Sequence, residues 1–289
     1  MLKHFVQSLL NAPDSVVGLN QRNFGLISKL NHRRDYQLAN DKILAKDFLG
    51  RIGVPTAETY HVYTALFELD SVIEDLKNYS NFVIKPANGS RGNGILILEQ
   101  PEPGKYFSLS GKNYTQAELK YFIASIIFGK FSMGQQDQAL IERMLVPDSR
   151  IKSLSYGGFS DIRVLISQEK FILAMLRLAT KASDGKANLH QGGIGVGVDL
   201  QTGVTTHAIL KDRQIQIHPD TKAELIGFML PEWNRILELS RLIAEQCPLK
   251  YIGVDLIIDD REGPMVIEFN ARPGLEIQNA NQIGIMDLL

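Results

Sequence analysis

Residues 251–274 read YIGVDLIIDDREGPMVIEFNARPG, and this stretch decides the fold. It consists of two apolar runs, IGVDLIID and PMVIEF, on either side of a polar turn at residues 260–263. Such a pattern predicts two antiparallel strands joined as a hairpin. Asp255 lies in the first run. Glu268 and Asn270 occupy alternate positions of the second, so both side chains project to one face of the sheet. The hairpin therefore predicts that three oxygen-bearing side chains gather in one place.

Asp255, Glu268 and Asn270 carry the hard oxygen ligands that suit a divalent cation. Mg²⁺ is commonly held by one or two carboxylates together with the phosphate oxygens of a substrate. In the alternative interpretation, these residues are buried polar groups that simply pair with Lys250 or Arg272. Three oxygen ligands on two neighbouring strands, beside an arginine, favour a metal site.

A second motif is FVIKPANGSRGNGILIL at residues 82–98, a strand, a glycine-rich loop at 88–94 and a second strand. Glycine has no Cβ, so such a loop can approach a polyanion closely and point backbone N–H groups at phosphate oxygens. The loop is not a P-loop, because no lysine follows its last glycine, and a strand instead of a helix follows it, unlike the dinucleotide fingerprint. The alternative is an ordinary glycine-rich hairpin. Lys85 at the end of the first strand favours phosphate binding.

Upstream, the segment DKILAKDFLGRIG at residues 41–53 has the spacing of a helix, with apolar residues at 44, 48, 49 and 52. Asn40 is the expected N-cap, and Gly53 is the expected end of the helix. Lys42 then lies in the first turn. Farther along the chain, Thr115 and Glu118 form a capping box that predicts the start of another helix.

A set of basic and amide side chains lies between these motifs. Arg163 and Arg177 fall among apolar neighbours on predicted strands, which favours an orientation toward a cleft over the more common surface ion pair. Guanidinium groups bind carboxylate or phosphate through two hydrogen bonds and stabilise developing negative charge. His190, in NLHQGG, is a candidate base, although a lone histidine is more often structural.

Composition limits the class of protein. The chain has 289 residues with 31 Lys and Arg against 32 Asp and Glu, and a net charge of −1 argues against a protein that coats nucleic acid. The single cysteine, Cys247, excludes an intrachain disulfide. The apolar runs are far shorter than the roughly 20 residues that a membrane span needs, and the first residues lack the features of a secretory signal. We therefore expect a cytoplasmic protein without a membrane or nucleic-acid partner.

The order of these elements predicts an α+β fold with three parts. Residues 1–40 form an N-terminal segment without a clear period, and residues 41–138 form a smaller lobe that contains the glycine-rich loop. Residues 139–289 form a larger, mainly antiparallel lobe that contains the metal site.

With these motifs assembled, the chain resembles the ATP-grasp carboxylate–amine ligases. It is similar to the ribosomal-protein glutamate ligases and, more closely, to the alpha-L-glutamate ligase-like proteins. The resemblance rests on the order of six stretches within residues 41–281 and on the E-x-N-x-x-P-G pattern in the last of them. They are DKILAKDFLGRIGVP, FVIKPANGSRGNGILIL, LIERM, SDIRVLI, KANLHQGG and YIGVDLIID…GPMVIEFNARPGLEIQNAN. It implies an ATP-grasp fold, in which two α+β lobes with antiparallel sheets clasp ATP between them, and a reduced region before the first lobe.

The resemblance also implies which residues bind the nucleotide. Lys42 and Lys85 are similar to the two lysines that contact the phosphates, and residues 88–94 to the loop that closes over them. Asp148 or Asp161 would reach the ribose, and Lys186 and Asn188 would lie toward the reacting phosphate. The other nucleotide-binding positions form two groups. The loop contributes Gly89, Ser90, Gly92 and Gly94. The hinge between the lobes, which would hydrogen-bond adenine, consists of Glu142, Arg143, Met144 and Leu145.

For the reaction itself, the resemblance implies that Asp255, Glu268 and Asn270 hold two Mg²⁺ ions, with Mn²⁺ as a substitute. The implied activity is an ATP-dependent ligation. A carboxylate is activated as an acyl phosphate and then joined to an amine of an amino acid or peptide, giving an amide, ADP and phosphate. Arg163, Arg177 and Arg272 would be catalytic. The alternatives are a phosphotransferase on the same scaffold and a non-catalytic ATP-binding module. The family leaves room for a homo-oligomer.

Two departures from the family's pattern bear on the substrates. Only about 40 residues precede Lys42, where such ligases usually carry an extra domain. Arg272 stands where the glutamate ligases tend to have a small residue, and Arg91 adds a further charge to the glycine-rich loop. We therefore expect part of the usual substrate wall to be absent or replaced, and Arg272 to add charge beside the metal site.

Overall fold

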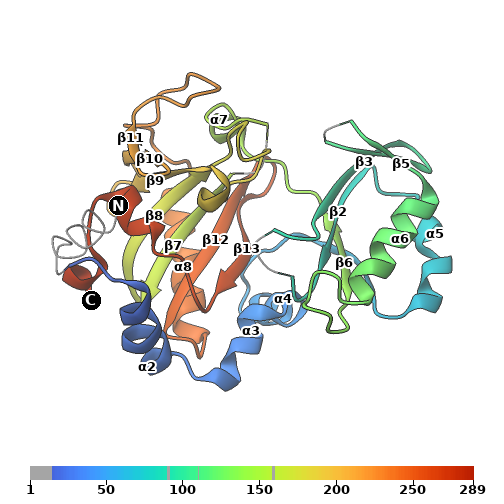
Figure 1. The fold of residues 1–289 in the computed structure, drawn as a ribbon, viewed down its shortest axis with the longest axis horizontal. Helices are drawn as coiled ribbons and strands as arrows, with labels where there is room; N and C mark the ends of the chain where they lie inside the picture. The colour runs from blue at the N-terminus through green and yellow to red at the C-terminus, as the bar shows by residue number, and fades with distance from the viewer. Residues whose placement is uncertain (1–14, 90–91, 110, 158–159) are drawn as a thin grey trace, which may run out of the picture. The chain divides into compact units, whose positions relative to one another are not determined.

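The computed structural model describes residues 15–89, 92–109, 111–157 and 160–289. The chain divides into two compact units (Figure 1). The smaller unit comprises residues 37–145, and the larger unit comprises the residues up to 36 together with 146–289. Within the described ranges, no helix combines the length and the apolar character that crossing a membrane requires.

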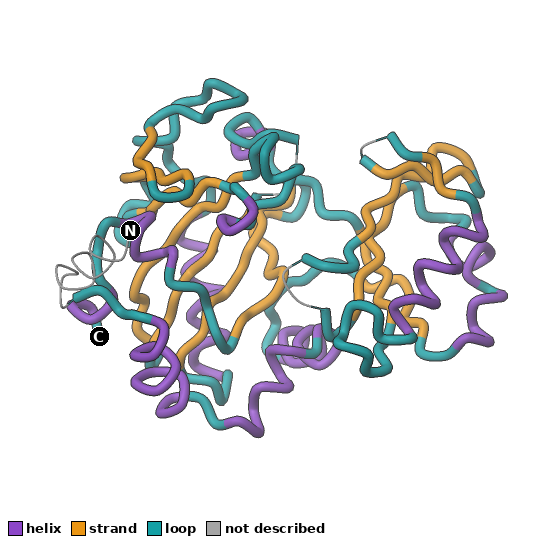
Figure 2. Tube along the Cα trace, in the orientation of Figure 1, coloured by secondary structure: helices purple, strands orange, loops and turns teal. Residues whose placement is uncertain are grey.

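The smaller unit is built on a six-stranded antiparallel sheet, drawn in orange with its helices in purple in Figure 2. In spatial order, its strands are β1 (Thr59–Tyr63), β6 (Ala139–Arg143), β2 (Asn81–Pro86), β3 (Leu96–Glu102), β4 (Lys105–Ser108) and β5 (Asn113–Tyr114). Its helices are α3 (Tyr36–Asn40), α4 (Lys42–Arg51), η3 (Leu66–Asp70), α5 (Val72–Leu76) and α6 (Gln116–Ile127).

One face of this sheet forms the core of the smaller unit, where Phe82, Ile84 and Ile141 are fully buried with Leu119 and Ile123 of α6. Because side chains alternate along a strand, the residues between these positions point to the other face. That places Lys85 of β2 and Glu142 of β6 together on the face away from the core.

The larger unit is built on a seven-stranded antiparallel sheet. In spatial order, its strands are β11 (Arg213–Ile215), β10 (Thr205–Leu210), β9 (Ile194–Val198), β8 (Lys170–Leu178), β7 (Asp161–Ser167), β12 (Tyr251–Asp259) and β13 (Gly263–Asn270). Its helices are η1 (Gln21–Ile27), α2 (Ser28–Leu30), η2 (Arg33–Asp35), α7 (Ser149–Lys152), η4 (Leu189–Gln191), α8 (Trp233–Gln246), α9 (Glu276–Asn281) and η5 (Ile285–Leu288).

Different helices pack on the strands of this larger sheet. The helix α8 contacts β12 and β13, whereas α9 contacts β8, β9 and β10. Leu165 and Met175 of the sheet pack in one cluster with Ile277 of α9 and with Val17 and Ile27 of the N-terminal segment. Side chains two or four residues apart on a strand project from the same face. Arg163 therefore shares a face with Leu165 on β7, and Asp255 shares it with Tyr251 on β12, so the candidate site lies on this face.

The predicted α+β class is confirmed, with an antiparallel sheet in each unit. The 251–274 hairpin is β12 and β13, and the capping box at Thr115 and Glu118 begins α6 as predicted. The expected N-cap of α4 was wrong. Asp41 caps the helix by accepting from Ile43 and Leu44, because Asn40 already belongs to α3.

Two boundaries differ in position from those expected. Residue 139, the expected start of the larger lobe, is the first residue of β6, which pairs with β1 and β2 in the smaller unit's sheet. Residues 15–36 of the N-terminal segment belong to the larger unit, and residues 37–40 belong to the smaller unit. In the larger unit, the Asn31 amide donates to the carbonyls of Tyr251 and Ala271 at 2.7 and 3.0 Å.

Candidate functional site

The larger unit brings the predicted oxygen ligands together through strand register. The strand β12 lies between β7 and β13, and Asp255 stands opposite Arg163 on one side and Glu268 on the other. The Asn270 amide donates to Asp255 Oδ2 at 3.2 Å and to Glu268 Oε1 at 3.3 Å. The predicted neighbourhood of Asp255, Glu268 and Asn270 is therefore present.

Two arginines bind the Asp255 carboxylate. Arg163 donates to both of its oxygens at 2.6 Å, and Arg177 Nη2 donates to Oδ2 at 2.9 Å. Arg177 also forms a two-point contact with Asp161. Lys250 pairs instead with Glu169, and the Arg272 guanidinium lies 4.9 Å from the ring centroid of Tyr36. The interpretation in which Lys250 or Arg272 neutralises the carboxylates is therefore wrong, because β7 and β8 supply the arginines.

Burial and charge act against each other on Asp255, which is 1% exposed. Burial by itself would raise its pKa, but the charges and hydrogen bonds of Arg163 and Arg177 outweigh that effect and hold the pKa below its ordinary value. Asp161 lies in the same cluster, where burial raises the pKa of its carboxyl group although the neighbouring Arg177 charge opposes that shift.

The donors of this cluster suit a hard divalent cation. Asp255, Glu268 and Asn270 bring two carboxylates and an amide together on two adjacent strands, and such groups carry the oxygen ligands that Mg²⁺ takes in proteins. In this structure both Asp255 oxygens accept from arginines, and the Asn270 amide nitrogen faces the two carboxylates. Among the described residues, no group of three or more His, Cys, Asp and Glu side chains is arranged to hold a metal by itself. A cation bound here would therefore take its remaining ligands from a substrate or from water, as Mg²⁺ at phosphate sites does.

The smaller unit contains a second charged cluster, on the sheet face away from its core. Glu142 is 4% exposed and forms ion pairs with Lys85 and Lys46. Burial lowers the pKa of Lys46, although the neighbouring Glu142 charge opposes that shift. The Glu142 carboxylate thus holds two lysine ammonium groups next to each other.

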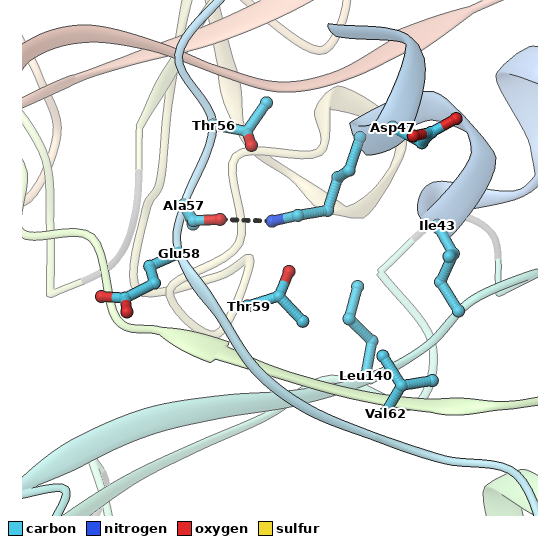
Figure 3. Close-up of a pocket in the computed structure, with 9 residues that line it drawn as sticks. Ile43, Asp47, Thr56, Ala57, Glu58, Thr59, Val62 and Leu140 are labelled. Carbon is cyan, nitrogen blue, oxygen red and sulfur yellow. Dashed lines mark hydrogen bonds between the residues drawn. The ribbon is translucent and has the colours of Figure 1, made fainter. Parts of the chain in front are cut away.

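Lys46 is a residue that the sequence analysis missed. It lies one helical turn after Lys42 in α4, so both side chains lie on the same side of the helix. This spacing in KILAK was the available signal. Its ammonium group also donates to the carbonyl of Ala57, the bond that is dashed in Figure 3.

A pocket of about 380 Å³ opens beside Lys46. Figure 3 shows Ile43 and Asp47 of α4 on one side and Ala57 and Glu58 on the other. Leu140 of β6 forms part of its apolar lining. The pocket lies wholly within the smaller unit, and Lys46, which lines it, shares the Glu142 carboxylate with Lys85.

The start of the glycine-rich loop is bonded to α4, because Lys42 Nζ donates to the carbonyl of Gly89 at 2.8 Å. At the other end, Gly94 has φ +78°, and a Cβ there would lie 2.5 Å from the ring of Phe131. The structure therefore gives a reason for glycine at 94. Ser90 and Arg91 of this loop lie outside the described residues.

Several other predicted site residues have local partners. Asp148 caps α7 and forms a two-point contact with Arg150, whose hydrogen bonds lower the pKa of the carboxyl group. Asn188 caps η4, and Lys186 is exposed in the preceding loop.

Of the expected hinge residues that follow Glu142, Arg143 ends β6, where its N–H donates to the carbonyl of Glu58 at 2.9 Å. Met144 is half-buried and Leu145 is buried. The structure thus shows where these residues lie in the smaller unit, and their contact with adenine stays a prediction.

Comparison with known proteins gives a family and relatives for this chain. The family described as sugar-transfer associated ATP-grasp matches residues 21–289. A probable alpha-L-glutamate ligase of Maridesulfovibrio salexigens is 24% identical over 238 residues, which cover 82% of this chain and 57% of that protein. A phosphoribosylamine–glycine ligase of Xylella fastidiosa is 25% identical over 240 residues, 82% of this chain and 44% of that protein. The chain thus spans about half the length of the curated relatives it matches.

Among solved structures, D-alanyl-alanine synthetase A from Vibrio cholerae O1 biovar eltor has a similar fold. Its TM-score is 0.53 at 11% sequence identity, and the match covers 87% of this chain and 62% of that chain. At this identity the likeness concerns the fold alone. The predicted ATP-grasp architecture is confirmed by this match together with the family.

Proposed function

The chain belongs to the sugar-transfer associated ATP-grasp family, and from that membership we propose that it is an ATP-dependent carboxylate–amine ligase. The observation that carries the proposal is the buried Asp255 carboxylate, which is held by Arg163 and Arg177 beside Glu268 and Asn270. The names of the relatives, an alpha-L-glutamate ligase and a phosphoribosylamine–glycine ligase, support ligation as the reaction class.

The proposed reaction has two steps. An oxygen of the substrate carboxylate attacks the γ-phosphorus of ATP, and the bond to ADP breaks, which gives an acyl phosphate. The nitrogen of an amine then attacks the acyl carbon, the bond to the phosphate oxygen breaks, and the nitrogen loses a proton. The products are an amide, ADP and phosphate.

We assign the arginines to the charge that develops on the phosphate and on the acyl oxygen. Arg163 and Arg177 are fixed on neighbouring strands by two-point contacts, so they need little reorganisation to stabilise that charge. Arg272 is exposed and packs on Tyr36, which leaves its guanidinium accessible to a substrate carboxylate. These roles differ, since the first two act through a prearranged cluster and the third through the surface of the larger unit.

The lysine cluster supports binding of the nucleotide phosphates. We propose that Lys42 and Lys85 contact phosphate oxygens, with Gly89, Ser90, Gly92 and Gly94 closing over them. Adenine would contact Glu142, Arg143, Met144 and Leu145, and Asp148 or Asp161 the ribose. Lys186 and Asn188 would approach the γ-phosphate.

Asp255, Glu268 and Asn270 would hold Mg²⁺, which supplies neutralisation of the phosphate charge when bound. We propose two ions, with Mn²⁺ as a substitute. We further propose that the substrates are small molecules or peptides, that nucleic acid is not a partner, that the protein acts in the cytoplasm where ATP is available, and that it can form a homo-oligomer.

The test of this proposal is ADP release from ATP and Mg²⁺ with pools of amino acids and short peptides, with product identification by mass spectrometry. We expect ADP together with a new amide. ADP with a phosphorylated product and no amide would instead identify a phosphotransferase. Nucleotide binding without turnover across the pools would identify a binding module.

Glu268→Gln is expected to abolish ADP release, because it removes one of the two carboxylates proposed to hold the cation. Glu262→Gln, in the turn between β12 and β13, is the matched control and should retain full activity. Full activity in Glu268→Gln would contradict the metal assignment.

A further inference from the structure

A second pocket lies on the larger unit, outside the two charged clusters described above. Its volume is about 240 Å³, and it is bounded by η4, by β10 with the turn that follows it, and by α9. Six of its lining residues carry the inference, Leu189, His190, Ile209, Lys211, Asp212 and Glu276. Pockets for drug-sized ligands measure about 300–1,000 Å³, so this one suits a smaller molecule.

Both signs of charge line this small volume. Lys211 and Asp212 form the two-residue turn between β10 and β11, and both are exposed. Within the described part of the chain, neither of these two side chains forms an ion pair. Ile209 is buried, and together with Leu189 it supplies apolar lining in the same pocket. A cationic group and an anionic group that line one small pocket with an apolar surface match a zwitterion.

Glu276 connects this pocket to the arginine–carboxylate cluster. Its Oε1 is 2.8 Å from His190 Nε2. A Cβ added to Gly274 would collide with Glu276 Oε2 and would lie 4.0 Å from Arg163 Nη1. The Glu276 carboxylate and the Arg163 guanidinium thus both lie close to the position that a side chain at 274 would occupy. The pocket therefore begins close to the side chain that binds Asp255.

We propose that this pocket binds the amine-bearing substrate, and that this substrate is a zwitterionic α-amino acid. Its carboxylate pairs with Lys211, and its ammonium group pairs with Glu276, on the side of the pocket nearest Arg163. The inference rests on the proposed ligase function for its role in the reaction. The binding of the amino acid itself does not depend on ligation.

Binding is measured by ligand-observed NMR titration of the full chain with glycine, L-alanine and L-glutamate, each with and without Mg²⁺ and a non-hydrolysable ATP analogue. At least one amino acid should bind the wild type. Propionate, which lacks the ammonium group of alanine, and ethylamine, which lacks its carboxylate, should each bind about tenfold more weakly or worse. Absence of binding by all three amino acids in both conditions overturns the proposal.

Variants locate the binding. Lys211→Gln and Glu276→Gln should each raise the Kd of the amino acid about tenfold or more, because each removes one charged partner. Lys222→Gln is a matched control, since Lys222 is also exposed and also has a left-handed backbone, with φ 64° against 57° for Lys211. Glu245→Gln on α8 is the exposed control for Glu276. An unchanged Kd in both Lys211→Gln and Glu276→Gln overturns the site, and circular dichroism checks that each variant is folded.

The same variants separate this inference from the proposed function. If ADP and an amide form but KM for the amino acid is unchanged in Lys211→Gln and Glu276→Gln, the ligase function stands and the pocket assignment is wrong. If the amino acid binds through Lys211 and Glu276 but no ADP forms, the pocket assignment stands and the ligase function is wrong.

Discussion

At the scale of single residues, both guanidinium groups of the larger unit's cluster donate to the same carboxylate, that of Asp255. Removing one partner of a buried ion pair is far more costly than removing an exposed one, because the other partner stays desolvated. If the Asp255 carboxylate were removed, Arg163 would lose both of its carboxylate contacts, whereas Arg177 would keep its contact with Asp161. The cluster thus has one residue on which its stability and its proposed chemistry both depend.

Asp255→Asn is therefore expected to lower the free energy of unfolding by about 3–5 kcal/mol, the usual cost of breaking a buried pair, and to abolish ADP release. Chemical denaturation measures the first effect, and the nucleotide assay measures the second. Asp260→Asn, at the exposed end of the same hairpin, should change neither. A variant at 255 with wild-type stability would show that the two arginines do not depend on this charge.

In the smaller unit, Glu142 is the buried carboxylate that two cationic side chains share, those of Lys46 and Lys85. Burial by itself raises its pKa, but the two lysine charges outweigh that, so the pKa lies below the ordinary value of 4.5. In the unfolded chain the carboxyl group takes up its proton near 4.5. The stabilisation from its charge is therefore complete above that pH and is lost as the pH falls through the lower folded pKa.

Glu142→Gln should be less stable than the wild type at pH 7, and the difference in unfolding free energy should shrink as the pH falls below 4.5. Urea denaturation at several pH values measures this difference. Glu58→Gln, at an exposed carboxylate of the same pocket, is the control and should show little difference at any pH. A difference that grows toward acid would contradict the predicted sign.

At the scale of elements, the N-terminal end of α4 determines where Lys42 is placed. Asp41 accepts from the N–H groups of Ile43 and Leu44 at 2.9 and 3.2 Å, which satisfies two of the free donors of the first turn. The expected cap, Asn40, makes no such contact because it ends α3.

Asp41→Ala should lower the free energy of unfolding by about 1 kcal/mol, the typical cost of a lost N-cap. Asn40→Ala should have a much smaller effect. Chemical denaturation of both variants measures the difference, and the reverse order of effects would restore Asn40 as the cap.

The glycine-rich loop offers a second prediction at this scale. Gly92 and Gly94 both have left-handed backbones, but only at Gly94 would a Cβ meet another group, the ring of Phe131. Gly92→Ala should therefore cost only backbone strain, about 1 kcal/mol, whereas Gly94→Ala adds a steric clash and should cost more. Thermal denaturation compares the two variants. Equal losses would mean that Phe131 moves aside without cost.

At the scale of the whole molecule, a ligand that binds only the folded state stabilises it in proportion to its concentration relative to Kd. Mg²⁺ with ADP at 100 times Kd should add about 2.7 kcal/mol to the free energy of unfolding and raise Tm. ADP with a chelator should give a smaller shift, and Asp255→Asn should lose the dependence on Mg²⁺. Differential scanning fluorimetry measures both. A shift that is independent of Mg²⁺ in the wild type would contradict the metal assignment.

The pattern of the sequence determined the elements and their faces. The alternation in IGVDLIID and PMVIEF predicted the hairpin at 251–274, and the period-two rule put Glu268 and Asn270 on one face, as the register with Asp255 confirms. Such features depend on neighbours within a few residues. Local periodicity and turn chemistry are written into a single stretch of chain.

Only the tertiary structure decided the partners. Arg163 meets Asp255 across 92 residues of sequence because β7 lies next to β12. Lys46 of α4 meets Glu142 of β6 across 96 residues. Strand order and helix docking result from burying apolar area over a whole unit, and no short segment contains that information. The types of charged residue could be read from the sequence. Which of them neutralise one another depended on the packing of distant elements.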